Sequence, residues 1–452
     1  MPLPAHHSYP VRSSGLRRLP RRRGWRRWVF LGWIGLCLVV AGRLLRQVPW
    51  RELRPRCVNW PAVYELGGVG YALLDLWETG EARCTEFRIP ADSMAYRAYL
   101  LGLAERRRPV PAVLRPRKNV IYVQMESVDG LVLGARYQGQ PLMPFLESLA
   151  RKEVYFANAI DNTSCGRTTD AGILTLTSLV PLRSAPVYMS QPLDRVPSLP
   201  KALNAAGYHT WSMHGSDGEF WRRNSAHVAL GFDETLFGDD LDASERIGWG
   251  ISDRSILHQA AQRIIEAKGP TFAHVILLTN HHPYQHVRQH RGLPQEGIVA
   301  DYVESVRYVD ESIAGFFGEL AAAGVLQNCI IAVYGDHDSS ITPQLERELQ
   351  TVPERAMADT VPLFVCGLPE APRRVDAVVG LQDVPVIVLE ALGLPVPLTF
   401  TGNSLDRPGR TVAAYYGALE STPAGLVASP MPVNQEILTL LALRHPERLM
   451  EP

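Results

Sequence analysis

Short β-rich apolar runs alternate with helical patterns along most of this chain, and this alternation constrains the fold more than any other feature. The first run, NVIYVQM, covers residues 119–125 and is short, β-rich and mainly apolar, as expected of a buried parallel strand. Strands separated by helices predict an α/β fold with a largely parallel sheet covered on both sides. The other strand-like runs are 210–213, 272–278, 329–334 and 362–366, and the helical patterns are 144–152, 255–267 and 302–323.

The first 27 residues carry eight arginines and no acidic residue, and an apolar run follows from Trp28 to Gly42. A cleaved signal has an apolar region of about 7–15 residues, whereas a membrane-spanning helix needs about 20. Extending the run to Leu45 gives it spanning length, because Arg43 can reach the headgroups. We predict an uncleaved single-pass anchor over 28–45, with residues 1–27 in the cytoplasm. The alternatives are a cleaved signal and a disordered arm for nucleic acid.

Three segments follow the anchor in the predicted organisation. Residues 46–117 are expected to form an extracytoplasmic connector that ends in a basic, proline-rich linker. Residues 118–405 contain the strand and helix patterns and are predicted to form the catalytic domain. Residues 406–452 are predicted to be a C-terminal tail, with a short amphipathic segment at 434–449.

Cysteine usage and charge limit the remaining possibilities. Cys57 and Cys84 lie in the connector and can form a disulfide in an oxidising compartment, although their spacing alone does not establish it. Cys329 and Cys366 lie in apolar runs and are expected to be small buried hydrophobes. The formal net charge is +0, so the chain as a whole is not expected to bind nucleic acid.

Polar side chains stand at the ends of two predicted strands. Glu126 follows the first run, and Asp336 and His337 follow the run 329–334. Ligands of open α/β sheets bind beyond the carboxyl ends of the strands. Two carboxylates and an imidazole suit Mn²⁺, Zn²⁺ or Mg²⁺. Taken singly, each residue is more often a helix cap, a salt-bridge partner or a turn residue.

Thr168 lies in a predicted polar loop, 161–170, before an apolar stretch. A hydroxyl on the same metal would have a lowered pKa and would be a competent nucleophile near neutral pH. The alternative is that Thr168 caps a helix starting near Thr169.

Eight motifs occur in order between residues 118 and about 345: NVIYVQMES, MPFL, ANAIDNTSCGRTTD, SMHGSDGEFWRR, LGFDE, LTNHHPY, VRYVDESI and YGDHD. Their order and spacing resemble the lipoteichoic acid synthase and phosphoglycerol transferase branch of the alkaline phosphatase/sulfatase superfamily. The resemblance implies an α/β sandwich of that type and one divalent metal, commonly Mn²⁺. The implied metal ligands are Glu126, Thr168, Asp336 and His337.

The resemblance also assigns roles around the metal. It implies that Thr168, the first threonine of GRTTD, is the nucleophile, with Thr169 as the rival. His281 and His337 would assist catalysis. The residues implied to hold the phosphoglycerol group are His214, Phe220, Trp221, Arg223 and His281. These types suit the task, because arginine grips phosphate oxygens at two points and histidine donates or shuttles protons. The aromatic side chains would separate the headgroup from water.

Three positions depart from the family pattern. Ser216 stands where relatives often have an aspartate, and Asp338 and Ser339 stand where some have an aromatic residue and a glycine. These departures bear more on the substrate than on the chemistry. Cys165 lacks the C-x-P-x-R setting of true sulfatases, so sulfate ester hydrolysis is disfavoured.

The sequence therefore predicts a phosphotransferase anchored in the cytoplasmic membrane, with its catalytic domain on the outer side. Its expected donor is a membrane phospholipid, most simply phosphatidylglycerol, and its acceptor is a hydroxyl of a cell-envelope glycan or polymer. Rival interpretations are a phosphoethanolamine transferase, a phosphodiesterase, and a non-catalytic membrane lipid sensor with the same fold. The sequence leaves the oligomeric state open.

Overall fold

The computed structural model of the chain describes residues 93–450, apart from 111–117, 184, 295, 351–359, 407–410, 415–416, 423–424 and 430. The basic start, the predicted anchor over 28–45 and the pair Cys57 and Cys84 lie outside these residues. Within the described ranges, no helix combines the length and the apolarity that a membrane crossing requires.

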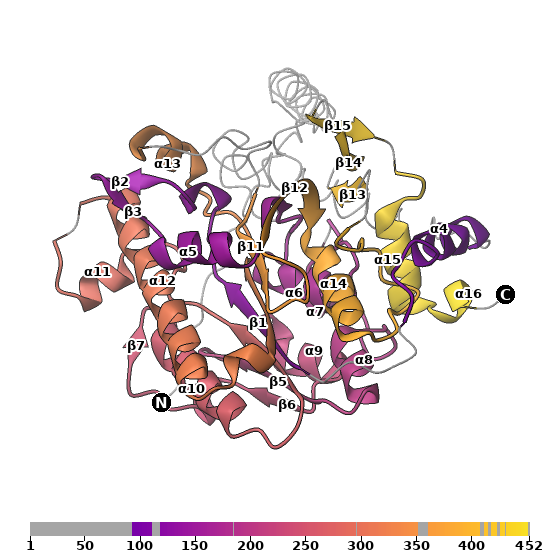
Figure 1. Cartoon of the computed structure of the whole chain (residues 1–452), viewed down its shortest axis with the longest axis horizontal. Coiled ribbons are helices and arrows are strands. Elements are labelled where there is room, and N and C mark those ends of the chain that lie inside the picture. Colours follow the sequence, from indigo (N-terminus) through magenta and orange to yellow (C-terminus); the bar gives the residue numbers. More distant parts are fainter. Residues whose placement is uncertain are drawn as a thin grey trace, which may run out of the picture. The chain divides into compact units, whose positions relative to one another are not determined.

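An eight-stranded sheet forms the centre of the fold (Figure 1). In spatial order it contains β12 (Arg373–Gly380), β4 (Val154–Ile160), β11 (Leu363–Cys366), β10 (Cys329–Gly335), β1 (Asn119–Met125), β9 (Thr271–Ile276), β5 (His209–His214) and β6 (Glu234–Leu236). The strands from β10 to β6 are mutually parallel, and β12 is parallel to β4. β11 is antiparallel to both its neighbours. The predicted mostly parallel sheet is confirmed, with β11 as the exception.

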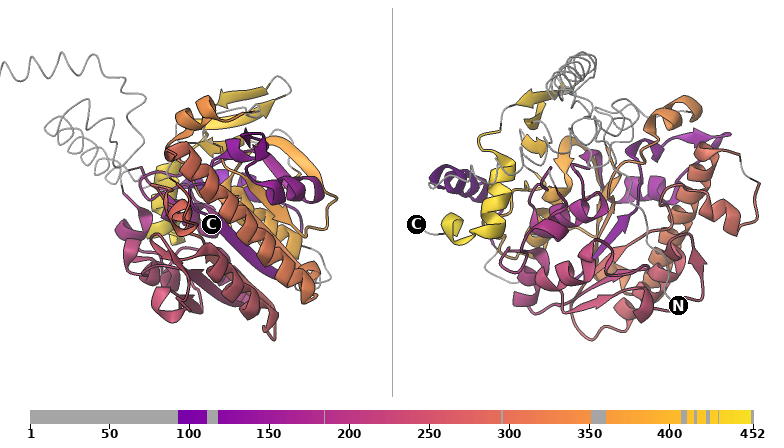
Figure 2. Two further views of the ribbon diagram at one scale, coloured as in Figure 1. Left: turned by 90° about the vertical axis from the view of Figure 1, so that its left-hand side faces the viewer. Right: turned by 180° about the vertical axis from the view of Figure 1, so that it is seen from behind.

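Helices cover both faces of this sheet (Figures 1 and 2). Successive side chains of β1 point alternately into two cores, Val120 and Tyr122 into one and Ile121 and Val123 into the other. The second core is shared with α5 (Pro144–Lys152), α10 (Asp253–Ile265) and α12 (Ile298–Ala322). The first core is shared with α6 (Thr168–Thr177), α8 (Leu199–Ala205), α14 (Val384–Leu392) and α15 (Gln435–Arg444).

Short elements connect these layers. The small helices include α7 (Val187–Ser190), α9 (Arg223–Ala229), α11 (His286–His290) and α13 (Thr342–Glu348). Two hairpins pair β2 (Arg136–Tyr137) with β3 (Gln140–Pro141), and β7 (Arg246–Ile247) with β8 (Gly250–Ile251). A separate three-stranded sheet contains β13 (Thr411–Ala414), β14 (Gly417–Thr422) and β15 (Gly425–Ser429).

Segments beyond the predicted 118–405 domain also belong to the folded unit. Helix α4 (Met94–Ala104) lies beside α15 and α16 (Glu447–Met450) in Figures 1 and 2, and the Ser93 hydroxyl donates to the Arg448 carbonyl at 2.7 Å. Leu100 of α4 and Leu441 of α15 are both fully buried in the first core. The connector and the tail therefore meet on the domain.

Two arginines of the predicted linker attach to the same unit. Arg107 Nη1 donates to the Pro397 carbonyl at 3.0 Å, and Arg108 Nη1 pairs with Glu370 at 2.5 Å. These basic side chains therefore bind the domain itself.

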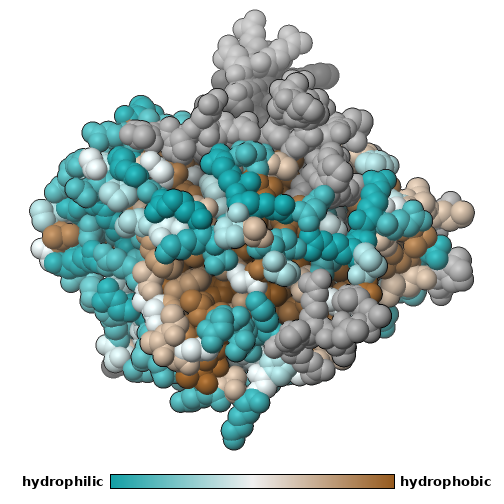
Figure 3. Space-filling model, in the orientation of Figure 1, coloured by the Kyte–Doolittle hydropathy of each residue, from teal (hydrophilic) through white to brown (hydrophobic). Residues whose placement is uncertain are grey.

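On the face seen in Figure 3, hydrophilic residues cover most of the described surface, and hydrophobic ones gather toward its lower centre.

Candidate active site

Two carboxylates and an imidazole meet where β1 and β10 end. Glu126 follows β1, and Asp336 and His337 follow β10, its parallel neighbour. One ligand atom from each side chain lies within 4.8 Å of the others, and all three side chains are buried. The sheet thus brings together three of the four residues predicted to bind a metal.

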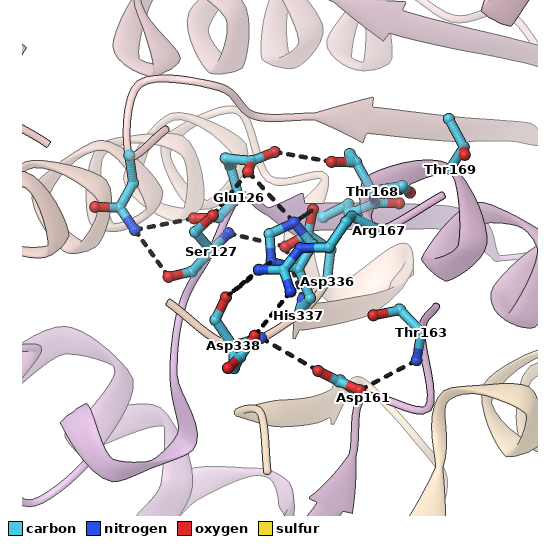
Figure 4. Close-up of polar contacts among 12 residues, drawn as sticks. Glu126, Ser127, Asp161, Thr163, Arg167, Thr168, Thr169, Asp336, His337 and Asp338 are labelled. Atoms are coloured by element: carbon cyan, nitrogen blue, oxygen red, sulfur yellow. Dashed lines mark hydrogen bonds and ion pairs between the residues drawn. The ribbon is translucent and has the colours of Figure 1, made fainter. Parts of the chain in front are cut away.

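Uncharged donors orient the two acidic residues of this cluster (Figure 4). Asp336 Oδ1 accepts hydrogen bonds from the backbone N–H groups of Ser127 and His337, each at 2.8 Å. The Ser127 hydroxyl donates to Glu126 Oε1 at 2.8 Å, and Asn280 Nδ2 donates to the Glu126 carbonyl at 2.9 Å. Sequence reasoning missed Ser127 and Asn280, although Ser127 directly follows the strand end that drew attention to Glu126.

The donor set fits a divalent cation. Asp336 Oδ2 is buried and has no hydrogen-bond partner in the described part of the chain, which costs free energy unless a cation or water contacts it. His337 Nε2 lies 3.4 Å from Glu126 Oε1 and 3.6 Å from Asp336 Oδ2. His337 Nδ1 lies 2.9 Å from the Asp338 carbonyl and 2.9 Å from Arg167 Nη2, and these contacts orient the imidazole.

The electrostatics of the cluster favour bound positive charge. Burial raises the pKa of Asp336 to about 7, and the charge of Glu126 acts in the same direction. Burial and Arg167 lower the pKa of His337, but the two carboxylates outweigh them and raise it to about 9. Burial opposes ionisation of Glu126, yet the hydrogen bond and charge of His337 hold its pKa below the ordinary value. A bound divalent cation would take the place of the His337 proton.

Thr168 lies beside this cluster as the first residue of α6. Its side chain is half-buried, and its Oγ1 donates to Glu126 Oε2 at 3.2 Å (Figure 4). The prediction of a loop through residue 170 is wrong, because α6 already begins at Thr168. The position suits a nucleophile, since the N–H groups at a helix start favour negative charge.

Thr169 faces a different environment. Its side chain is 2% exposed, and its hydroxyl donates to the Gly166 carbonyl at 2.9 Å. In Figure 4 the Thr169 side chain points away from Glu126 and His337, whereas that of Thr168 points toward Glu126. The geometry therefore separates the two candidate hydroxyls.

The turn before α6 is built around Asp170. Its Oδ2 accepts from the N–H groups of Ser164 and Gly166 at 2.9 and 2.8 Å, and burial raises the pKa of Asp170 to about 7. A Cβ on Gly166 would lie 2.3 Å from Asp170 Oδ1, so only glycine fits. Arg167 follows with a φ of 44°, an uncommon conformation that concentrates at functional sites. In the sequence, this turn is indicated only by Asp170 standing four residues after Gly166.

Two predicted substrate-binding residues, His214 and Arg223, are 3% and 2% exposed. His214 Nδ1 lies 3.0 Å from the Ile276 carbonyl, to which it donates, and burial and the charge of Arg223 lower the pKa of His214 to about 3. Arg223 Nη1 is buried without a hydrogen-bond partner among the described residues. Burial lowers the pKa of Arg223, and the negative charges that oppose this include Glu126. An unpaired guanidinium N–H group attracts an anion.

The other predicted substrate residues lie closer to the surface. Phe220 is 57% exposed and packs edge-on against Trp221, with ring centroids 5.6 Å apart. Trp221 has a φ of 60°. His281 is half-buried, its ring centroid is 5.0 Å from that of Trp249, and its charge acts on Glu126. The structure thus brings His281 toward the carboxylates, whereas Phe220 faces solvent.

The departures from the family pattern have partners in this chain. Asp338 forms an ion pair with Arg167 at 3.0 Å, and a second Arg167 nitrogen donates to the Ser340 hydroxyl at 3.0 Å. The Ser216 hydroxyl donates to the Trp249 carbonyl at 3.4 Å. Asp338 therefore anchors the residue that directly precedes Thr168.

Comparisons with known proteins agree with this architecture. Residues 118–394 match the sulfatase family. Lipoteichoic acid synthase 2 of Bacillus subtilis is 28% identical over 292 residues, which cover 61% of this chain and 45% of that protein. A lipoteichoic acid synthase of Staphylococcus aureus is 28% identical over 231 residues, which cover 49% of this chain and 36% of that protein. The chain thus spans less than half the length of these curated relatives.

Solved structures share the fold. The lipoteichoic acid synthase LtaP from Listeria monocytogenes gives a TM-score of 0.59 at 21% identity, covering 74% of this chain and 90% of that one. An alkaline phosphatase superfamily protein from Vibrio parahaemolyticus gives 0.62 at 18% identity, covering 80% and 97%. With the family match over 118–394, the chain belongs to the sulfatase family.

Proposed function

We propose that the protein is a metal-dependent phosphoglycerol transferase. It would move the glycerophosphate headgroup of phosphatidylglycerol to a hydroxyl of a cell-envelope glycan or polymer. The observation that carries this proposal is the buried Arg223 Nη1, which has no hydrogen-bond partner in the described ranges and belongs to a guanidinium whose charge interacts with Glu126 and Asp336 at the strand ends. A guanidinium held in this way can bind a negatively charged ligand, and a phosphodiester is such a ligand. The resemblance of the sequence motifs to phosphoglycerol transferases favours glycerol as the headgroup.

The chain's own residues divide the proposed reaction between them. Thr168 Oγ1 attacks phosphorus, the bond from phosphorus to the diacylglycerol oxygen breaks, and a phosphoglycerol–threonine ester remains. The acceptor hydroxyl then attacks the same phosphorus and releases Thr168. Arg223 and His214 hold the phosphoglycerol group, and His281 serves proton transfer to the leaving oxygen. A divalent ion at Glu126, Asp336 and His337, with Mn²⁺ as the first choice, would lower the pKa of the nucleophilic hydroxyl and neutralise phosphoryl charge.

The proposed location follows from the donor, which resides in a membrane. We place the chain in the cytoplasmic membrane through residues 28–45, with the catalytic domain on the outer side. The protein should stay in the membrane fraction after a high-salt wash. Recovery of a soluble, N-terminally trimmed chain would identify the apolar run as a cleaved signal.

The nucleophile provides the sharpest test of the proposed function. Purified protein is incubated with phosphatidylglycerol vesicles and Mn²⁺, and its intact mass is measured. We expect a phosphoglycerol adduct that disappears in Thr168→Ala and persists in Thr169→Ala, because only Thr168 Oγ1 faces Glu126. Labelling of Thr168→Ala, or an unlabelled parent that turns over no lipid, would contradict the proposal. A phosphoethanolamine adduct from mixed vesicles would instead support the rival headgroup.

A further inference from the structure

Gln124 is a fully buried carboxamide inside an otherwise apolar part of β1. Its Nε2 donates a hydrogen bond to the backbone carbonyl of Thr168 at 3.0 Å. Gln124 lies on β1, and Glu126 directly follows the end of this strand. β1 and the residue that follows it therefore contact Thr168 at two points, the carbonyl through Gln124 and the hydroxyl through Glu126 at 3.2 Å.

We infer that Gln124 is a positioning residue, which fixes the backbone of Thr168 so that its hydroxyl stays directed at Glu126. The inference rests on the proposed function, because it assumes that Thr168 is the nucleophile. Gln124 itself need not touch the substrate, since its partner is the Thr168 carbonyl.

Neighbouring strands fix the orientation of the Gln124 carboxamide. The hydroxyl of Tyr334, on β10, donates to Gln124 Oε1 at 3.2 Å, and His274 Nε2, on β9, lies 3.1 Å from the same oxygen. A carboxamide oxygen only accepts, so His274 Nε2 carries the proton of this hydrogen bond. Burial lowers the pKa of His274 to about 3, which keeps the imidazole neutral. With Oε1 occupied by two donors, the NH₂ group is left to face Thr168.

The same network reaches α6 a second time. The Tyr334 hydroxyl lies 3.1 Å from Thr175 Oγ1, seven residues after Thr168 on the helix. The central strands β1 and β10 thus contact α6 through buried polar groups at Thr168 and at Thr175. Apolar packing alone tolerates small rotations and shifts, whereas directed hydrogen bonds at two points resist them. A displacement of about 1 Å at a reacting atom can lower a rate on the order of a hundredfold.

Three variants test this inference. Gln124→Met removes the donor to Thr168 and keeps an unbranched side chain of similar length. Tyr334→Phe keeps the ring but removes the hydroxyl that donates to Gln124 Oε1, so that only His274 still orients the carboxamide. Thr177→Val is the matched control, because Thr177 is a fully buried residue on α6 whose hydroxyl donates to the Ile173 carbonyl at 2.7 Å. The measurements are the rate of adduct formation, KM for phosphatidylglycerol, Mn²⁺ affinity by calorimetry and the thermal midpoint.

If Gln124 only positions Thr168, its substitution should change the rate constant of adduct formation and leave the other measured quantities nearly unchanged. For Gln124→Met we expect adduct formation to slow by roughly ten- to a hundredfold, with KM and Mn²⁺ affinity within about twofold of the parent. Tyr334→Phe should show a smaller fall in the same rate. Thr177→Val should lower the thermal midpoint and leave the rate of adduct formation unchanged.

The failures of the two proposals look different. Parent-like labelling by folded Gln124→Met would overturn the inference and leave the proposed function standing. If Gln124→Met does not fold, parent-like labelling by Tyr334→Phe overturns the inference in the same way. Equal slowing in Thr177→Val would also overturn it, because the effect would then be general loosening of α6. A parent that forms no adduct overturns both proposals.

Discussion

At the scale of single residues, a buried cation is costly to keep in a folded chain, and Arg223 is 2% exposed. Its Nη1 has no hydrogen-bond partner among the described residues, and burial lowers its pKa. The charges of Glu126 and Asp336 act on this guanidinium, but among the described residues no acceptor receives a hydrogen bond from its Nη1. Such an arrangement is maintained when a ligand completes it, because stability is then traded for binding.

This trade predicts opposite effects of one substitution on activity and stability. Arg223→Met should lower kcat/KM for phosphatidylglycerol on the order of a hundredfold, because it removes donors to phosphoryl oxygens. The same change should leave the free energy of unfolding unaltered or raise it by about 1–2 kcal/mol, because the buried charge is gone. Urea unfolding and steady-state kinetics measure the two quantities. Arg222→Met, at the exposed neighbouring position, should alter neither. A strongly destabilised Arg223→Met would show that the guanidinium is structural.

Asp336 provides a matching prediction for the metal. Asp336→Asn keeps an oxygen for the N–H groups of Ser127 and His337 but removes the charge. Mn²⁺ should stabilise the parent by about 2.7 kcal/mol at a hundredfold excess over its Kd, seen as a rise in thermal midpoint that a chelator reverses. Asp336→Asn should lose this rise. Asp310→Asn, a buried acid on α12, should retain it. An undiminished Mn²⁺ response in Asp336→Asn would exclude this cluster as the metal site.

At the scale of elements, Asp310 of α12 caps the start of α5. Its two carboxylate oxygens accept from the N–H groups of Phe145 and Leu146 at 2.8 and 2.9 Å. Burial nevertheless raises the pKa of Asp310 from 3.8 to about 6, against the opposing effect of these hydrogen bonds. The folded chain therefore holds the Asp310 proton more tightly than the unfolded chain does. The contribution of this proton to the free energy of unfolding is complete below about pH 4 and is lost as the pH rises through 6.

The cap makes a pH-dependent prediction. Because asparagine does not titrate, the stability advantage of the parent over Asp310→Asn should shrink between pH 4.5 and 7, with a limiting slope of about 1.4 kcal/mol per pH unit. Urea unfolding of both chains across this range measures the difference. An advantage that grows with pH would mean that the ionised carboxylate is the better cap.

The sequence predicted the central elements well and the edges of the sheet poorly. The strand Asn119–Met125 and the helix Pro144–Lys152 have the predicted bounds, because each is a continuous or clearly amphipathic pattern. Strands β4 and β12 were missed. β12 begins with two exposed arginines, and β4 is only half-buried along part of its length, so neither has a strand's usual apolar signal. The antiparallel direction of β11 depends on chain topology, which periodicity does not encode.

Some residues of the site could also be predicted from the sequence, and others could not. Glu126, Asp336 and His337 were predictable because strand ends of one parallel sheet share an edge. The burial of Arg223 and the contact of Gln124 with Thr168 were not, since both depend on how separate segments pack. A carboxamide two residues before Glu126 in a buried strand was the one sequence signal for Gln124.

At the scale of the whole molecule, the folded unit is larger than the predicted domain 118–405. Helix α15 of the tail buries Leu438, Leu440, Leu441 and Leu443 in the first core. It also contacts the segment after α6, since Thr439 Oγ1 donates to the Val180 carbonyl at 2.7 Å. Glu436 accepts from the Arg183 N–H at 2.9 Å. The tail therefore supports the helix that begins with Thr168.

A chain that ends at residue 430 should consequently fail to fold, although it contains every predicted site residue. Each buried leucine contributes about 1.5–3 kcal/mol, so the four in α15 together approach the whole stability of a typical domain, about 5–15 kcal/mol. The expected result is the loss of the cooperative thermal transition and of Mn²⁺ binding, measured by circular dichroism and calorimetry. Leu441→Ala is the graded control, which should cost about 2–5 kcal/mol and keep a cooperative transition. A truncated chain that melts at the parent's midpoint would show that the tail is an appendage and that the domain ends near residue 405, as its sequence pattern predicts.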